Sequence, residues 1–316
     1  MNLLRVLKAA ALVCGLTLSG ISLAQAATTK DLFLKDDARC TECHDEADAP
    51  ELLAIGKTRH AVKADSRTPT CTSCHGKSDK HVEYKGKDKP PKPDTVFGKK
   101  ASTSHQDKSE ACLTCHKSDS KSSHWEGSVH QSRDVACSSC HLIHVAKDKV
   151  LDKKSEAEVC FACHKEQRVQ FNKPSRHPIP EGKVACSDCH NAHGSTGPSL
   201  MKRNSVVETC YTCHMEKRGP FVRNHQPVNE DCSICHNPHG TTTASLLKSR
   251  PPFLCQTCHT PHGPIQPSVA NGPVVNPGWW NGSTMTQGRS CMNCHTQVHG
   301  SNNPSTALPT PQRLFR

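Results

Sequence analysis

Cysteine and histidine residues recur in this chain at a spacing that could attach a redox cofactor. Ten times, two cysteines separated by two residues are followed directly by a histidine. This C-x-x-C-H pattern is the attachment signature of c-type haem, in which both thiols bond the porphyrin and the histidine ligates the iron. The cysteines are Cys40, Cys43, Cys71, Cys74, Cys112, Cys115, Cys137, Cys140, Cys160, Cys163, Cys186, Cys189, Cys210, Cys213, Cys232, Cys235, Cys255, Cys258, Cys291 and Cys294. The motif histidines are His44, His75, His116, His141, His164, His190, His214, His236, His259 and His295. The pattern predicts ten covalently attached haems c, each with one iron.

Two other uses of paired cysteines were weighed. An exported chain with an even number of cysteines can be a disulfide scaffold, and C-x-x-C pairs can form zinc sites. Neither use requires a histidine after every pair. With 22 His among 316 residues, such a coincidence at all ten pairs is not expected by chance. The haem interpretation is therefore favoured.

Ten further histidines recur in register with the motifs and predict the sixth ligand of each iron. They are His60, His81, His130, His144, His177, His193, His225, His239, His262 and His299. His105 and His124 fall outside this register. His130 precedes the next motif at a distance similar to that in the other regular repeats and His124 does not, so His130 is predicted as the ligand. Iron with two histidine ligands has no open position for a substrate.

This closed ligand set favours an electron carrier and not an enzyme. The sequence has no C-x-x-C-K motif, which multihaem nitrite reductases use at their reactive haem. It also has no recognisable hydrolytic triad, phosphate-binding loop or dinucleotide fingerprint, and no catalytic residue is predicted.

The motifs and spaced histidines repeat as five two-haem modules, and internal repeats of this kind define an architecture. Each module has a motif, an inner histidine, a second motif and a trailing histidine. Modules 1 to 5 cover residues 40–81, 112–144, 160–193, 210–239 and 255–299. They make up one predicted electron-transfer domain at 27–316.

The N-terminal segment predicts a cleaved signal peptide at 1–26. Arg5 and Lys8 precede an apolar run, and Ala24-Gln25-Ala26 has the small-x-small pattern of a cleavage site. The apolar run is shorter than the roughly 20 residues of a membrane-spanning helix. Cys14 would be removed with this segment, and the mature chain would be exported.

The composition indicates how the elements must hold these residues. Only 34% of residues are hydrophobic, whereas about 45–50% is usual, so the haems would have to supply the core. With 22 Pro and 18 Gly, we expect a multihaem cytochrome c fold: mostly coil with short α-helices wrapped around a chain of ten haems, and little or no β-sheet. Haem propionates would offset the formal charge of +11, so no nucleic-acid partner is predicted.

Local patterns give finer expectations. Ser155-x-x-Glu158 and Ser205-x-x-Glu208 predict capping boxes that lead helical turns into two of the motifs. The segment 84–110 is rich in Lys, Pro and Asp and predicts a solvated linker. The segment 263–289 predicts an irregular loop in which Trp279-Trp280 packs on a haem.

The chain resembles the periplasmic decahaem cytochromes of outer-membrane porin–cytochrome conduits. The ten motifs and stretches such as 144–148 (HVAKD), 216–220 (EKRGP) and 297–301 (QVHGS) carry this resemblance across the predicted mature chain. The family is the MtrA/MtoA type, related to the decahaem cytochromes associated with dimethyl-sulfoxide reductases (DmsE type). This chain departs from it in a short region before the first motif.

The resemblance implies a location, partners and a role. The family subunit threads an outer-membrane β-barrel porin and links periplasmic cytochromes, or a quinol-oxidising cytochrome, to an extracellular multihaem cytochrome or mineral. It implies two histidine ligands on every iron and a periplasmic location at the outer membrane. Both Fe(III) reduction and Fe(II) oxidation are compatible with such a ligand set. The alternative is a soluble periplasmic shuttle that feeds a terminal reductase.

Overall fold

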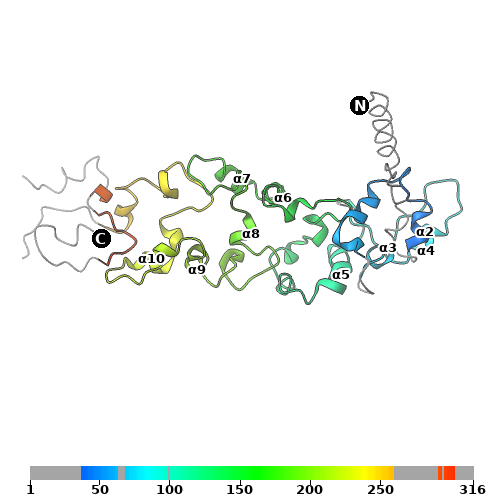
Figure 1. The fold of residues 1–316 in the computed structure, drawn as a ribbon, viewed down its shortest axis with the longest axis horizontal. Coiled ribbons are helices and arrows are strands. Elements are labelled where there is room, and N and C mark those ends of the chain that lie inside the picture. The colour runs from blue at the N-terminus through cyan, green and yellow to red at the C-terminus, as the bar shows by residue number, and fades with distance from the viewer. Residues whose placement is uncertain (1–36, 63–67, 99, 260–290, 294, 303–316) are drawn as a thin grey trace, which may run out of the picture.

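The protein is elongated, and its chain advances along the long axis in sequence order. A computed structural model describes residues 37–62, 68–98, 100–259, 291–293 and 295–302. Helices α2 (Ala38–Thr41), α3 (Cys71–His75) and α4 (Asp79–Val82) lie at one end, and α10 (Gln226–Glu230) lies toward the other (Figure 1). Successive modules are therefore successive segments of a rod.

Short helical turns separated by coil make up the described chain. The remaining α-helices are α5 (His105–His116), α6 (Glu156–Cys160), α7 (Lys165–Gln170), α8 (Cys186–Cys189) and α9 (Val206–Tyr211). The 3-10 turns are η3 (Leu52–Lys57), η4 (Arg59–Ala61), η5 (Gln131–Arg133), η6 (Cys137–Ser139), η7 (Lys149–Leu151), η8 (Pro198–Leu200), η9 (Met215–Lys217), η10 (Cys232–Ile234), η11 (Ala244–Leu246), η12 (Cys255–Thr257) and η13 (Cys291–Asn293). Extended pairing within the described ranges is limited to isolated bridges such as Ser175 with Thr241. The predicted fold class is confirmed.

The two predicted capping boxes behave differently. The Ser205 side chain accepts a hydrogen bond from the Glu208 backbone N–H at 3.1 Å and caps α9, which is one of the two hydrogen bonds of the expected capping box. Ser155 precedes α6 but makes no cap hydrogen bond. Its hydroxyl donates instead to the Lys149 carbonyl at 2.8 Å. The expected cap at Ser155 is therefore wrong, because the Ser155 backbone is helical (φ −113°, ψ −12°) and not extended as in an N-cap residue.

Very little apolar side-chain surface is buried in the described chain. Its main cluster consists of Ala157, Phe171 and Ile179, with a few partly buried neighbours. Large apolar side chains such as Leu151 and Val222 are 77% and 76% exposed. A chain of this length is not stabilised by so small a protein core. Within the described ranges, no helix has the length and apolar character needed to span a bilayer.

The segment 84–110 is solvated over residues 84–92 as expected, but it does more than link two modules. The Nδ1 N–H of His81 donates to the Pro91 carbonyl at 2.6 Å, and that of His75 donates to the Thr95 carbonyl at 2.8 Å. Helix α5 begins within the same segment. The residue types of this segment did not indicate these contacts, because the acceptors are backbone carbonyls, which every residue has.

Several predicted features lie outside the described residues. They are the signal peptide, His262, Cys294 and the loop that contains Trp279-Trp280.

Candidate haem-binding sites

Each motif is folded as about one helical turn. The His141 backbone N–H donates to the Cys137 carbonyl at 2.9 Å, and His164 bonds in the same way to Cys160 at 2.9 Å. Residues three and four apart lie on one face of a helix. This turn therefore presents both cysteines and the histidine to the same side, as attachment of one planar group requires.

Nine of the motif histidines pair with nine of the spaced histidines at nearly constant separation. The distance between ring centroids is 5.9–6.3 Å in every case. The pairs are His44–His81, His75–His144, His116–His60, His141–His193, His164–His130, His190–His239, His214–His177, His236–His299 and His259–His225. The remaining motif histidine is His295, and the remaining spaced histidine, His262, lies outside the described residues.

This separation fits a metal held between two imidazoles. A metal–nitrogen bond is about 2.0–2.1 Å long, which puts ring centroids on opposite sides of one metal about 6 Å apart. The angle between the ring planes ranges from 6° for His44–His81 to 85° for His130–His164, while the distance hardly changes. Direct contact between ring faces does not produce a constant distance at every angle. The separation of the paired rings thus matches what two histidine ligands of one haem iron would need.

The pairs link neighbouring modules. His130 of module 2 faces His164 of module 3, and His193 of module 3 faces His141 of module 2. The same crossing recurs at each described junction: the inner histidine pairs forward and the trailing histidine pairs backward. His81 is the exception, because it faces His44 of its own module. Ligand pairing is consequently an inter-module contact.

The two histidines outside the predicted register stand apart in the structure as well. His105 begins α5 and His124 precedes Trp125, and both side chains are exposed. His130 is partly buried and has the ring separation expected of a ligand. This geometry supports the choice of His130 over His124.

Hydrogen bonds orient many of the paired rings through Nδ1. Eight donate to backbone carbonyls at 2.6–3.1 Å: His75, His81, His130, His144, His177, His190, His193 and His236. A carbonyl oxygen only accepts, so Nδ1 carries the proton and Nε2 is left with a free lone pair. Partners of this kind fix the tautomer and orientation of metal-ligating histidines.

Burial keeps several of these rings in the neutral form that can ligate a metal. It lowers the pKa values of His75, His193 and His239, with neighbouring histidines adding to the shift. The pKa values of His60 and His299 are lowered mainly by burial too.

Two motif histidines donate to carboxylates instead. His116 Nδ1 lies 2.6 Å from Asp119 Oδ2 in an exposed pair. His141 Nδ1 lies 2.8 Å from Asp148 Oδ2, and the Asp148 side chain is only 11% exposed.

Contacts between cysteines show which motifs are neighbours in space. Within module 2 the Cys112 thiol hydrogen-bonds with Cys137, which lowers the pKa of Cys137 to about 6. Equivalent contacts join the first cysteines of the paired motifs in the other modules. Between modules the second cysteines approach each other, as Cys74 and Cys115 do. Neighbouring motifs in sequence are thus neighbours in space.

The alternative uses of the cysteines find no support in the geometry. Among the described cysteines from Cys40 to Cys291, no disulfide is formed. In the part of the chain that the structure describes, no three Cys, His, Asp or Glu side chains converge as ligands for a bare metal ion.

A buried polar side chain ties the two motifs together in each of the first three modules. Asp37 Oδ1 accepts from the Cys71 N–H at 2.6 Å, and Ser109 Oγ accepts from the Cys137 N–H at 3.4 Å. Glu156 Oε1 accepts from the Ser187 N–H at 3.2 Å. Each acceptor lies one turn before the first motif of its module and reaches the start of the second. We call these three side chains the motif clamps.

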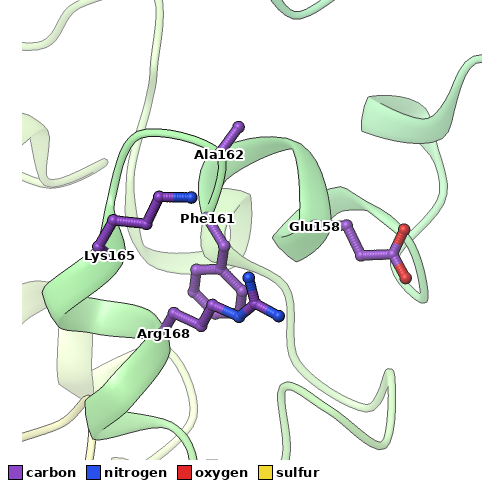
Figure 2. Close-up of a pocket in the computed structure, with 5 residues that line it drawn as sticks. All are labelled: Glu158, Phe161, Ala162, Lys165 and Arg168. Carbon is purple, nitrogen blue, oxygen red and sulfur yellow. The ribbon is translucent and has the colours of Figure 1, made fainter.

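A depression beside the first motif of module 3 does not suggest a substrate site. Glu158, Phe161, Ala162, Lys165 and Arg168 line it. In Figure 2 the Arg168 side chain lies along the Phe161 ring and Glu158 points away. The Phe161 ring packs at 5.9 Å from Phe171, so it belongs to the small apolar cluster.

Comparison of the sequence with known proteins shows the family of this chain. The chain is 43% identical over 276 residues to the multihaem cytochrome MtrA of Shewanella baltica, which covers 85% of this chain and 79% of that protein. The chain belongs to the MtrA family of multihaem cytochromes. The doubled CXXCH family model matches residues 177–219 and 225–264, and the model for NrfB-like c-type cytochromes matches 71–159.

More distant relatives agree with this family. The c-type cytochrome NrfB of Escherichia coli O6:H1 is 29% identical over 54% of this chain and 93% of its own length. NrfB of Haemophilus influenzae is 30% identical over 41% of this chain and 65% of its own length. The MtrA-family chain is therefore a multihaem c-type cytochrome that transfers electrons and is not an enzyme, as the motifs predicted.

Proposed function

We propose that this MtrA-family chain conducts electrons along ten haems c arranged in sequence order. The ten cysteine pairs attach the haems, and the motif histidines and ten spaced histidines serve as the two axial ligands of each iron. The nine ring pairs at constant separation, spaced along one rod, are the observation that carries this proposal. His295 and His262 are the two histidines left over, and we infer that they form the tenth pair, within module 5.

The side chains determine what kind of chemistry takes place. A bound haem supplies one-electron Fe(III)/Fe(II) exchange. A motif histidine and a spaced histidine would together hold each iron, which would leave no position open for a substrate. Thioether attachment and the Nδ1 hydrogen bonds hold the ligands in fixed geometry, which limits rearrangement when the charge changes. Neighbouring modules are held in register by the crossed pairs, so electrons pass from site to site along the chain.

The proposed site of action is the outer membrane, inside a β-barrel porin. Similarity to MtrA and the elongated shape support this proposal. Backbone in coil cannot face lipid because its N–H and C=O groups would lose hydrogen bonds. A sheath with a polar lumen removes that cost. We infer a periplasmic chain with periplasmic or quinol-oxidising cytochromes at one end and extracellular iron, or an extracellular multihaem cytochrome, at the other.

Liposomes that enclose an electron acceptor test the conduit. We expect external reductant to reduce the enclosed acceptor only when the chain is reconstituted with its porin. Liposomes with the porin alone are the control. Equal transfer by the cytochrome without a porin would contradict the conduit, and a native form found only as a free periplasmic monomer would favour the soluble shuttle.

Haem stoichiometry and spin state test the ligand set. We expect ten covalent haems per chain, a wholly low-spin oxidised spectrum and negligible carbon monoxide binding after reduction. A high-spin haem in native protein would contradict closed coordination and favour a reductase with its own substrate site.

A further inference from the structure

The hydrogen bond between His141 and Asp148 differs from those at the equivalent positions of other modules. His141 is the histidine of the second motif in module 2. The second-motif histidines of modules 3 and 4, His190 and His236, donate from Nδ1 to the backbone carbonyls of Ser199 and Ser245 at 2.9 and 2.8 Å. His141 donates instead to a carboxylate oxygen at 2.8 Å. The chain therefore contains its own comparison between a neutral and a charged acceptor.

The negative charge of Asp148 is held close to the ring and away from water. Its side chain is 11% exposed, and its Oδ1 accepts a second hydrogen bond from the Val150 N–H at 3.4 Å. The lysines on either side are paired elsewhere: Lys147 with Asp152 at 3.1 Å and Lys149 with Glu158 at 3.6 Å. The charge on Asp148 thus acts mainly on His141.

Two other carboxylates lie near motif histidines but are solvated. Asp119 contacts His116 with 57% of its side chain exposed. Glu216 lies 3.6 Å from His214 and is 59% exposed. Water screens exposed charges strongly and partly buried charges much less, so Asp148 is expected to have the larger electrostatic effect.

We propose that Asp148 is a positioning residue that lowers the reduction potential of the haem site at Cys137, Cys140 and His141 relative to the equivalent sites at His190 and His236. This inference rests on the proposed axial role of His141. Ferric iron carries one more positive charge than ferrous iron, and a carboxylate hydrogen-bonded to its ligand increases the ligand's electron donation. Both effects favour the ferric state. Because module 2 lies between modules 1 and 3, the proposed chain of haems then contains an internal site of low reduction potential.

Asp148→Asn tests this proposal with little change in shape. Asparagine still accepts from Nδ1, as the carbonyls of Ser199 and Ser245 do, and it can still cap η7. In a spectroelectrochemical titration of the holoprotein, we expect about one tenth of the haem absorbance to titrate at higher potential. The expected change is about tenfold in the reduction equilibrium constant, or about 59 mV for one electron. Asp119→Asn is the matched control, with an expected change below about twofold because that carboxylate is exposed.

Haem count and spin state separate this inference from the function on which it rests. If Asp148→Asn keeps ten low-spin haems and titrates as the native protein does, the inference is overturned while the proposed electron-conducting function stands. If native protein lacks bis-histidine haem, the proposed function fails first. Asp148→Ser supplies a second neutral side chain, so poor haem loading in one variant leaves the other to decide. An upward shift in either loaded variant, absent in Asp119→Asn, supports the inference.

Discussion

The imidazole of His130 lies 6.2 Å, between ring centroids, from that of His164 in the motif of the following module. In return, His193 of that module lies 6.0 Å from His141. Two ligand pairs thus cross each junction of this kind in opposite directions. A two-haem module is a unit of sequence repetition, but its motif histidines pair with histidines of the neighbouring modules.

Replacing His130 with alanine should open the iron bound by His164, one module further on. We expect about one tenth of the haem to become high-spin and to bind carbon monoxide after reduction, because one of ten proposed irons loses its distal ligand. Optical and magnetic circular dichroism spectra measure both effects. His124→Ala is the control and should leave the spectra unchanged. High-spin haem in the His124 variant, with none in the His130 variant, would contradict the assigned pair.

Electron paramagnetic resonance should distinguish two classes of haem. The ring planes cross at 81° in the pair of His60 with His116 and at 85° in the pair of His130 with His164. They are nearly parallel, at 6°, in the pair of His44 with His81. Crossed imidazole planes leave two iron d orbitals almost equal in energy and give highly anisotropic low-spin signals, whereas parallel planes give rhombic signals. We expect both types in the oxidised protein, with the anisotropic signal in the minority. A purely rhombic spectrum would contradict these ring orientations.

Gly240→Ala should destabilise the junction between modules 3 and 4. Gly240 has φ of +144°, and a Cβ there would collide with the Gln170 carbonyl. The next residue, Thr241, is held by a pair of backbone hydrogen bonds with Ser175 at 2.8 and 3.2 Å, so the segment cannot easily shift. We expect a loss of about 1–3 kcal/mol in the free energy of unfolding. Denaturant titration followed at the Soret band measures it.

Gly98→Ala is the control for this substitution, because a Cβ there meets no atom within 4 Å. It should change the free energy of unfolding by less than about 0.5 kcal/mol. Equal stability of the Gly240 and Gly98 variants would show that the junction is not closely packed.

Glu156→Ala should weaken module 3 by removing its motif clamp. The carboxylate is 6% exposed and accepts from the Ser187 N–H. Its removal leaves a partly buried donor unpaired, at a cost of about 1–3 kcal/mol in the free energy of unfolding. Glu156→Gln retains an acceptor and should lose less. Glu158→Ala, at a side chain that is 70% exposed, is the control and should be nearly neutral. The clamp assignment fails if the variants at Glu156 and Glu158 unfold alike.

Local sequence patterns predicted local structure well, but they did not predict contacts between residues far apart in the sequence. The pattern Ser205-x-x-Glu208 predicts the helical turn that leads into Cys210, because the hydrogen bond from the Glu208 N–H to the Ser205 side chain closes within four residues. The partner of His75 could not be read from spacing, since His144 reaches it across a whole module. Ser155 failed as a cap because its backbone is helical and not extended, which the residue types of the capping pattern do not reveal. Backbone carbonyls, such as that of Pro91 on His81, carry no signal in residue type.

The crossed pairs also give the assembly of the protein an order in time. As the chain is made from its N-terminus, the site at His75 lacks its second histidine until His144 has been added. The site at His141 likewise lacks its second histidine until His193 has been added. The site at His164 finds His130 already present. Each new module therefore completes the one before it and is half-completed by it. A chain that ended after module 1, 2, 3 or 4 should therefore leave one proposed haem site, at its last motif, without a second histidine.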